Sequence, residues 1–125
     1  MEVVGIRGAI VAEENEAAAV TKATVRLIRT LLEENKLEAE AIISMFFTMT
    51  PDLNAVFPAA AAREVCGLDV PLLCATEIGV PGGLQKVIRV LVHAYSPLGR
   101  GGVVHTYIGG AKKLRPDLKR GGNDR

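Results

Sequence analysis

Apolar residues recur along the chain at two spacings, and each spacing predicts one type of element. Alternation at every second residue is typical of strands, whereas a stripe at every third or fourth residue is typical of an amphipathic helix. The helical stripe runs through residues 16–34, where glutamates at and before its start favour the positive end of a helix dipole. A shorter helix is expected from Pro58, near its first turn, to Gly67, just past its end. Strand patterns occupy residues 3–11, 41–50, 70–78, 86–95 and 103–108.

The predicted order is therefore strand, helix, strand, helix and then three strands. Such an order favours an α/β or α+β fold, in which a mixed β-sheet has helices packed on one side. A chain of 125 residues has the size of one domain. We expect a single domain over residues 1–118, followed by a basic tail, residues 119–125, that should be disordered.

Composition and charge exclude some classes of protein. Apolar residues make up 49% of the chain and charged residues 23%, as in folded soluble proteins. The formal net charge of +1 gives no general attraction to nucleic acid, so any affinity for anions must be local. The charge-free runs are too short to span a bilayer, and Glu2 and Arg7 do not suit a secretion signal. A cytoplasmic protein without a membrane partner is expected.

The cysteines and histidines form no recognisable pattern for a metal site. Cys66 and Cys74 lack the CxxC spacing, and only two histidines accompany them. In a reducing compartment both cysteines are expected as free thiols. We therefore expect no bound metal.

Two arginines lie in the middle of strand patterns. Arg7 is framed by glycines, which could allow either a bulge or the close approach of a ligand, and Arg89 is flanked by apolar residues on its own face. A guanidinium is costly to bury without an anion, so the pair would suit a small ligand that bears carboxylates or phosphate. The alternative is that both strands lie at sheet edges, where the arginines reach water or pair with Glu77 or Asp52.

Cys74 and Glu77 lie three residues apart near the end of the third strand pattern. Strict alternation would place them on opposite faces, so they could share a site only if the strand twists or ends near Ala75. Otherwise Cys74 is a small buried apolar residue and Glu77 a solvated turn residue. A Cys-His nucleophilic pair with His93 or His105 is conceivable, but no spacing supports it.

Three further residues have both a structural and a functional interpretation. Phe57 and Arg63 lie near the two ends of the short helix, on different faces. Taken alone, Phe57 is better interpreted as a buried core residue and Arg63 as a surface residue. Tyr107 is more often a core residue than a site residue, and its buried hydroxyl would need a partner. The basic tail could bind nucleic acid, but no aromatic residues are interleaved with its charges, so we expect no nucleic-acid partner.

Taken together, six segments resemble the monofunctional bacterial chorismate mutases of the trimeric α/β type. Any one of them would be weak, but all six occur in family order at family-like spacings. The segments are GIRGA (5–9), TPDLNAVFPAAAARE (50–64), CATE (74–77), GGLQKVIRVL (82–91), HTYI (105–108) and LRPDL (114–118).

The resemblance implies a homotrimer of pseudo-α/β-barrel subunits with active sites between neighbouring chains. It implies conversion of chorismate to prephenate in phenylalanine and tyrosine biosynthesis, without a cofactor. The catalytic residues that it implies are Arg89, Glu77, Arg7, Cys74 and Tyr107. The substrate-binding residues that it implies are Phe57, Ala59, Arg63, Leu73, Leu114 and Arg115.

By the same resemblance, each catalytic residue has an expected role in an intramolecular rearrangement that needs no nucleophile or proton relay. Arg89 would meet the ether oxygen of chorismate, where negative charge develops. Arg7 and Tyr107 would position a carboxylate, and Glu77 and Cys74 would hydrogen-bond the ring hydroxyl.

A competing hypothesis is a non-catalytic trimer that binds a small dicarboxylate. Binding would need carboxylate clamps but no cation at an ether oxygen, so the joint presence of Arg7, Glu77 and Arg89 favours the enzyme. The chain departs from the family pattern at Ala60, where relatives often carry a charge, and at residues 109–110, where relatives usually have residues larger than glycine.

Overall fold

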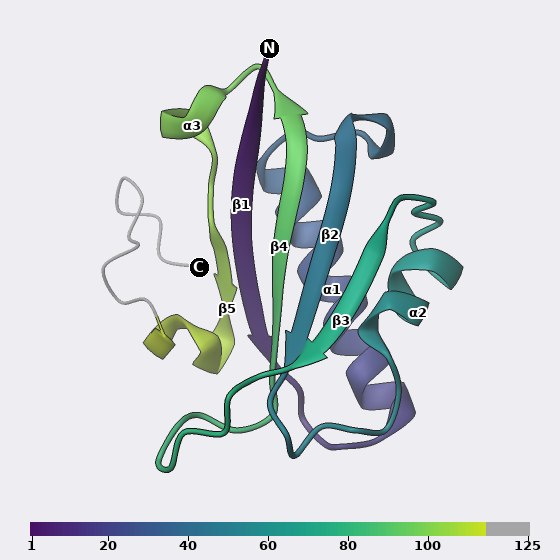
Figure 1. Cartoon of the computed structure of the whole chain (residues 1–125), viewed down its shortest axis with the longest axis vertical. Coiled ribbons are helices and arrows are strands. Elements are labelled where there is room, and N and C mark those ends of the chain that lie inside the picture. Colours follow the sequence, from purple (N-terminus) through teal and green to yellow (C-terminus); the bar gives the residue numbers. More distant parts are fainter. Residues whose placement is uncertain (115–125) are drawn as a thin grey trace.

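The structure is a computed structural model, and it describes residues 1–114. The predicted order of strands and helices is confirmed (Figure 1). The main elements are β1 (Glu2–Val11), α1 (Ala17–Glu34), β2 (Ile42–Met49), α2 (Pro58–Glu64), β3 (Leu72–Thr76), β4 (Val87–Ser96) and β5 (Thr106–Ile108). Three short helical segments were not predicted: η1 (Ala39–Ala41), α3 (Gly99–Gly102) and η2 (Gly109–Leu114). Arg115 and the predicted basic tail, residues 119–125, lie outside the described residues.

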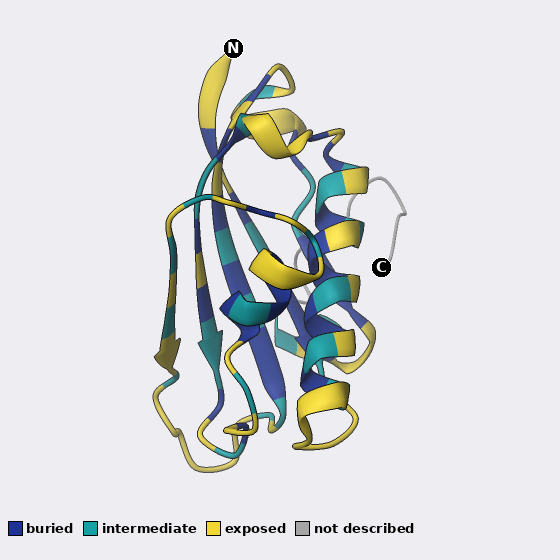
Figure 2. Cartoon of the chain, turned by 90° about the vertical axis from the view of Figure 1, so that its right-hand side faces the viewer, coloured by how far each residue is buried: buried dark blue, intermediate teal, exposed yellow. Residues whose placement is uncertain are grey.

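The five strands form one mixed sheet in the order β3-β2-β4-β1-β5. Strand β4 runs antiparallel to β1 and β2, whereas β5 is parallel to β1 and β3 is parallel to β2. Helices α1 and α2 lie on the same side of the sheet (Figure 2), which confirms the predicted arrangement. Because β1 and β4 each have a strand on both sides, the interpretation of Arg7 and Arg89 as edge-strand residues is wrong.

The core lies between the sheet and the helices, and it follows from the strand alternation. The residues of β4 that face the helices, among them Ile88, Val90 and Val92, are buried. They pack with the apolar stripe of α1, which includes Leu27 and Leu31. Burying each such side chain contributes about 1.5–3 kcal/mol. On the opposite face, Ala111 of η2 packs with Ala9, Val87 and Tyr107 in a small second cluster. The rest of that face carries both strand arginines and has exposed residues such as Phe46 and Tyr95.

Gly8 allows β1 to pack closely against α1 and β5 directly beside Arg7. A Cβ at Gly8 would lie 3.0 Å from Leu27 Cδ1 and 3.1 Å from the carbonyl oxygen of Thr106. The register between β1 and β4 is continuous, so no bulge occurs at either glycine beside Arg7. Gly8 therefore permits the close packing of β1 against α1 and β5, and it does not mark a bulge.

Asn35 fastens the segment before β5 to the end of α1. Its buried Nδ2 donates to the carbonyl oxygens of Leu31 at 2.8 Å and Val104 at 2.9 Å. Its Oδ1 accepts from the backbone N–H of Val104 at 2.7 Å. The side-chain amide thus takes the place of a strand partner for Val104, which explains why β5 begins at Thr106 rather than at the predicted residue 103.

We predict that Asn35→Ala lowers the free energy of unfolding by about 2–4 kcal/mol, because Val104 keeps a donor and an acceptor that have lost their partner. Chemical denaturation at a fixed protein concentration measures this loss. The matched control is Asn54→Ala, which removes an exposed side-chain contact with Asn15 and should change stability by less than about 0.5 kcal/mol. Equal losses in the two variants would contradict the structural role of Asn35.

Candidate active site

Arg7, Arg89 and Tyr107 lie together on the sheet face opposite α1 and α2. In the strand register, Ala9 pairs with Arg89 on β4 and with Tyr107 on β5. Arg7 shares this face because it lies two residues before Ala9. All three side chains line a cavity of about 210 Å³ together with Gly8, Phe46, Thr48, Val90 and Leu91. The sheet therefore brings together three of the five residues predicted to be catalytic.

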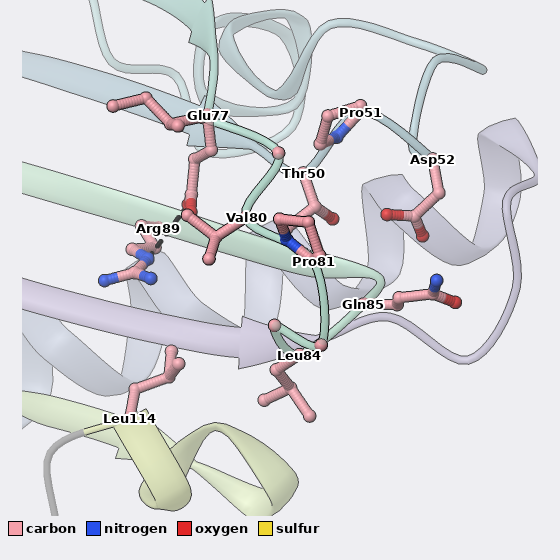
Figure 3. A pocket seen from close by; sticks show the side chains of 14 residues that line it. Thr50, Pro51, Asp52, Glu77, Val80, Pro81, Leu84, Gln85, Arg89 and Leu114 are labelled. Carbon is pink, nitrogen blue, oxygen red and sulfur yellow. Dashed lines mark ion pairs between the residues drawn. The ribbon is translucent and has the colours of Figure 1, made fainter.

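Arg89 is held from one side by Glu77. The Nε atom of Arg89 lies 2.9 Å from Oε2 of Glu77 (Figure 3), although its N–H is not aligned for a hydrogen bond, so charge attraction dominates this contact. The hydroxyl of Thr48 donates to the same carboxylate oxygen at 2.8 Å. The side chain of Arg89 is 43% exposed and that of Glu77 14% exposed. Glu77 therefore braces Arg89 from within the protein, while the guanidinium reaches the open side.

The orientation of the guanidinium leaves donors for a ligand. Its two terminal nitrogens lie on the far side of the group from Glu77 (Figure 3). A guanidinium has five N–H donors, and the four on the terminal nitrogens are left for a ligand. The pairing with Glu77 that the sequence left open is thus present, and it is compatible with a bound anion.

A larger cavity of about 460 Å³ is also lined by Arg89. Its other walls come mainly from the loop between β3 and β4, with further residues from the segment that follows β2 and from η2. They are Thr50, Pro51, Asp52, Glu77, Ile78, Gly79, Val80, Pro81, Gly82, Gly83, Leu84, Gln85, Arg89 and Leu114. Because Arg89 lines both cavities, its guanidinium is available to a ligand in either of them.

The loop beside the larger cavity is fixed by backbone contacts at both ends. The N–H of Glu77 donates to the carbonyl oxygen of Met49 at 2.8 Å. The N–H of Lys86 donates to Oδ2 of Asp52 at 2.9 Å, and Lys86 has a positive φ of 57°. The carboxylate of Asp52 therefore accepts a hydrogen bond from the backbone at the end of the loop, whereas the carboxylate near Arg89 is that of Glu77.

Phe57, Arg63 and Leu73 do not line either cavity. Phe57 immediately precedes α2 and is 71% exposed, so its interpretation as a buried core residue is wrong. Leu73 is 69% exposed on β3. Arg63 is an exposed residue of α2, which confirms its interpretation as a surface residue. Ala59 is buried against the core.

Cys74 lies on the opposite side of the sheet from the cavity of Arg7. It pairs with the fully buried Phe47 and packs against the main core. Alternation thus holds through β3, and its continuation past the strand end at Thr76 places Glu77 on the face of Ala75, which pairs with Thr48 beside Arg89. Cys74 therefore lines neither of the two cavities that contain Arg89.

Both cysteines are free thiols, as predicted. Burial raises the pKa of the Cys66 thiol, and the nearby charge of Arg29 lowers it by a smaller amount. Among residues 1–114, no three histidine, cysteine or carboxylate side chains are grouped to hold a metal ion. No helix in this part of the chain is both long and apolar enough to cross a membrane.

The sequence interpretation missed Thr48, which orients Glu77. Thr48 pairs with Arg89 in the register between β2 and β4 and therefore lies beside it on the same face. Its hydroxyl is 2.8 Å from the carboxylate of Glu77. Only a correct pairing of β2 with β4 could have indicated this contact, because the two strands are distant in the sequence and no local pattern fixes their register.

The sequence and the fold match known enzymes. The family model for chorismate mutase type I matches residues 3–118. The chorismate mutase AroH of Thermus thermophilus is 44% identical over 116 residues, which are 92% of this chain and 95% of that protein. The chorismate mutase AroH of Bacillus subtilis strain 168 is 39% identical over 119 residues, which are 94% of each protein. A solved chorismate mutase from Clostridium thermocellum superposes with a TM-score of 0.85 at 42% identity, covering 88% of this chain and 98% of that one.

These matches define the protein as an enzyme of the isomerase class, which rearranges bonds within one substrate molecule. The chain belongs to the chorismate mutase type I family, and the resemblance seen in its six segments is confirmed. It is a chorismate mutase of aromatic amino acid biosynthesis. The competing hypothesis of a non-catalytic dicarboxylate-binding protein is therefore wrong.

Proposed function

We propose that the protein converts chorismate to prephenate by an intramolecular [3,3] rearrangement in which Arg89 stabilises the ether oxygen. The observation that carries this proposal is the placement of Arg89. Its Nε is braced by Glu77 at 2.9 Å, and its terminal nitrogens are left for a ligand beside Arg7 and Tyr107. The rearrangement needs no group to be transferred to the protein, so binding and electrostatics supply the catalysis.

Arg7 and Tyr107 act on the conformation of the substrate. Chorismate is a flexible dianion, and it reacts only when the two carbons that form the new bond lie close together. Arg7 and Tyr107 line the same cavity as Arg89 and hold a carboxylate there. Fixing the compact conformer removes part of the entropic barrier before the reaction begins.

Arg89 acts on the charge that appears during bond breaking. The cleaved C–O bond leaves partial negative charge on the ether oxygen, so a cation at that oxygen stabilises the transition state more than the ground state. Glu77 and Thr48 fix the guanidinium in advance, and little reorganisation is needed when the charge develops.

Glu77 also accepts a hydrogen bond from the ring hydroxyl of the substrate, and we expect Glu77→Gln to lower kcat/KM by about tenfold or more. Glutamine keeps the shape of the side chain but loses the ion pair with Arg89, and a hydrogen bond to a neutral amide is about 1.4 kcal/mol weaker than one to a carboxylate. Steady-state kinetics on chorismate measure the loss. The same change at Glu33, an exposed residue of α1, is the control and should leave the rate unchanged. Equal rates for Glu77→Gln and wild type would remove Glu77 from the mechanism.

The enzyme acts as a homotrimer whose sites lie between neighbouring chains. The sheet face that carries Arg89 also exposes large apolar residues, among them Val3, Phe46 and Tyr95. An apolar sheet face without cover favours association with another chain. A neighbouring chain then supplies Phe57, Ala59, Arg63, Leu73 and Cys74 to the site, while Leu114 lines it from the same chain as Arg89. Light scattering tests this point, because a monomer under active conditions would contradict an interfacial site.

The direct test of the reaction is the loss of the ultraviolet absorbance of chorismate, with the product identified as prephenate by mass and by its acid-catalysed conversion to phenylpyruvate. Rapid, enzyme-dependent formation of prephenate is the expected result. A folded trimer that leaves chorismate unchanged would overturn the proposal.

A further inference from the structure

His105 contacts the site but has no part in the chemistry described above. The backbone N–H of Arg7 donates a hydrogen bond to Nδ1 of His105 at 3.0 Å. A ring nitrogen that accepts a hydrogen bond carries no proton, so the proton of this neutral imidazole is on Nε2. His105 also lies two residues before Tyr107, on the segment that leads into β5.

The position of this hydrogen bond explains why a side chain is needed there. Strand β5 has three residues, and its pairing with β1 begins at Gly8 and Thr106. The N–H of Arg7 therefore points towards β5 one position before the ladder starts, where no strand carbonyl meets it. A backbone donor that is shielded from water must find another partner. The imidazole of His105 takes the place of that carbonyl.

The residues on both sides of His105 are tied to the end of α1. Val104 exchanges two hydrogen bonds with the buried side chain of Asn35, at 2.7 and 2.9 Å. The hydroxyl of Thr106 donates to Oε1 of Glu34 at 2.9 Å. The imidazole thus projects from a segment that is hydrogen-bonded to the end of α1 on both sides of His105, and its own hydrogen bond links this segment to the backbone of Arg7.

We propose that His105 is a positioning residue of the active site, which holds the backbone of Arg7 at a fixed distance from Tyr107. Both residues line the cavity of about 210 Å³ and would grip the same end of the substrate. The proposal rests on the proposed function only in that Arg7 must bind a carboxylate. A misplacement of about 1 Å in such a group can reduce the rate by about 10²-fold.

The first test compares His105→Leu with His105→Asn. Asparagine can place its Oδ1 near the position of Nδ1 and accept from Arg7, whereas leucine cannot. We expect His105→Leu to lower kcat/KM by at least about tenfold, with His105→Asn within about threefold of wild type. Should the leucine variant fail to fold, His105→Ala takes its place under the same criteria. Equal activity of the two variants, whether both high or both low, would overturn the proposal.

The matched control is Thr106→Val, which removes the hydrogen bond to Glu34 on the helix side of the same segment. This change should lower the Tm while leaving kcat/KM close to that of wild type. If it costs as much activity as His105→Leu, general loosening of β5 explains the loss and the positioning role is wrong.

A double-mutant cycle with Arg7 separates positioning from other effects. If His105 acts through Arg7, then Arg7→Ala combined with His105→Leu is no slower than Arg7→Ala alone. Additive losses would show that His105 acts elsewhere and overturn the inference. An Arg7→Ala variant with wild-type kinetics would instead contradict the proposed function of Arg7. A large loss in Arg7→Ala with none in His105→Leu would overturn the role of His105 alone.

Discussion

Arg89→Ala is expected to lower kcat on chorismate by at least about 10²- to 10³-fold, the loss that follows removal of one well-placed transition-state donor. The loss should appear mainly in kcat, because in the proposed mechanism the guanidinium binds the ether oxygen more strongly as the C–O bond breaks than in the bound substrate. Removing Arg89 also leaves Glu77, which is 14% exposed, without its cationic partner. The variant should therefore be compared with wild type by circular dichroism and light scattering before its kinetics are interpreted.

Two further variants make this experiment specific. Arg89→Lys keeps the positive charge but cannot both contact Glu77 at one nitrogen and present two others, so it should recover only part of the lost activity. Arg29→Ala removes an exposed arginine of α1, on the other side of the sheet, and should retain full activity. If Arg89→Ala keeps wild-type kcat, the family assignment stands but the ether-oxygen role of Arg89 is wrong.

A mixture of two inactive variants, Arg89→Ala and Arg63→Glu, is expected to recover activity when the chains assemble together. In the described chain Arg89 lines the cavities, whereas Arg63 is exposed on α2 and lines neither of them. A site between chains would take Arg89 from one subunit and Arg63 from its neighbour. A glutamate at residue 63 would repel the dianionic substrate at a cost of several kcal/mol.

The recovered activity can be predicted from the assembly. In a cyclic trimer with one type of contact between chains, random mixing at equal amounts gives roughly a quarter of the sites both native residues. The experiment consists of refolding or co-expressing the two variants, followed by the chorismate assay at a fixed total protein concentration. Each variant refolded alone is the control. Recovery no greater than the mean of the two variants would show that each site is built within one chain.

The local elements of this protein could be predicted from its sequence because their signals are local. The alternation through residues 3–11 and the stripe through residues 16–34 match β1 and α1 to within a residue or two. Pro58 begins α2, and Gly67 lies just past its end with a φ of +68°. These features depend on backbone sterics and on the burial of one face, which act over a few residues.

Some boundaries differ where contacts between distant residues replace the strand ladder. The segment 103–105 has the composition of a strand, but Asn35 and the backbone of Arg7 take its hydrogen bonds, and β5 is shortened to three residues. Phe57 is a large apolar residue of the kind usually found in a core, yet the helix that it precedes buries other residues instead. In both cases the partner lies far along the chain, and no local pattern specifies it.

By itself the sequence determined the order of the elements, the helix-covered mixed sheet, and the family, because periodicity and six motifs are properties of the chain alone. Only the tertiary structure decided the partners of the site residues. The register of β4 against β1 and β2 places Arg89 beside Ala9 and Thr48, and the end of β3 brings Glu77 to it. Strand register depends on contacts between residues that are distant in sequence, and a shift of one position would turn Arg89 to the helix side. For that physical reason the strand arginines could be identified from the sequence, whereas the carboxylate that braces Arg89 and the histidine that holds Arg7 required the folded chain.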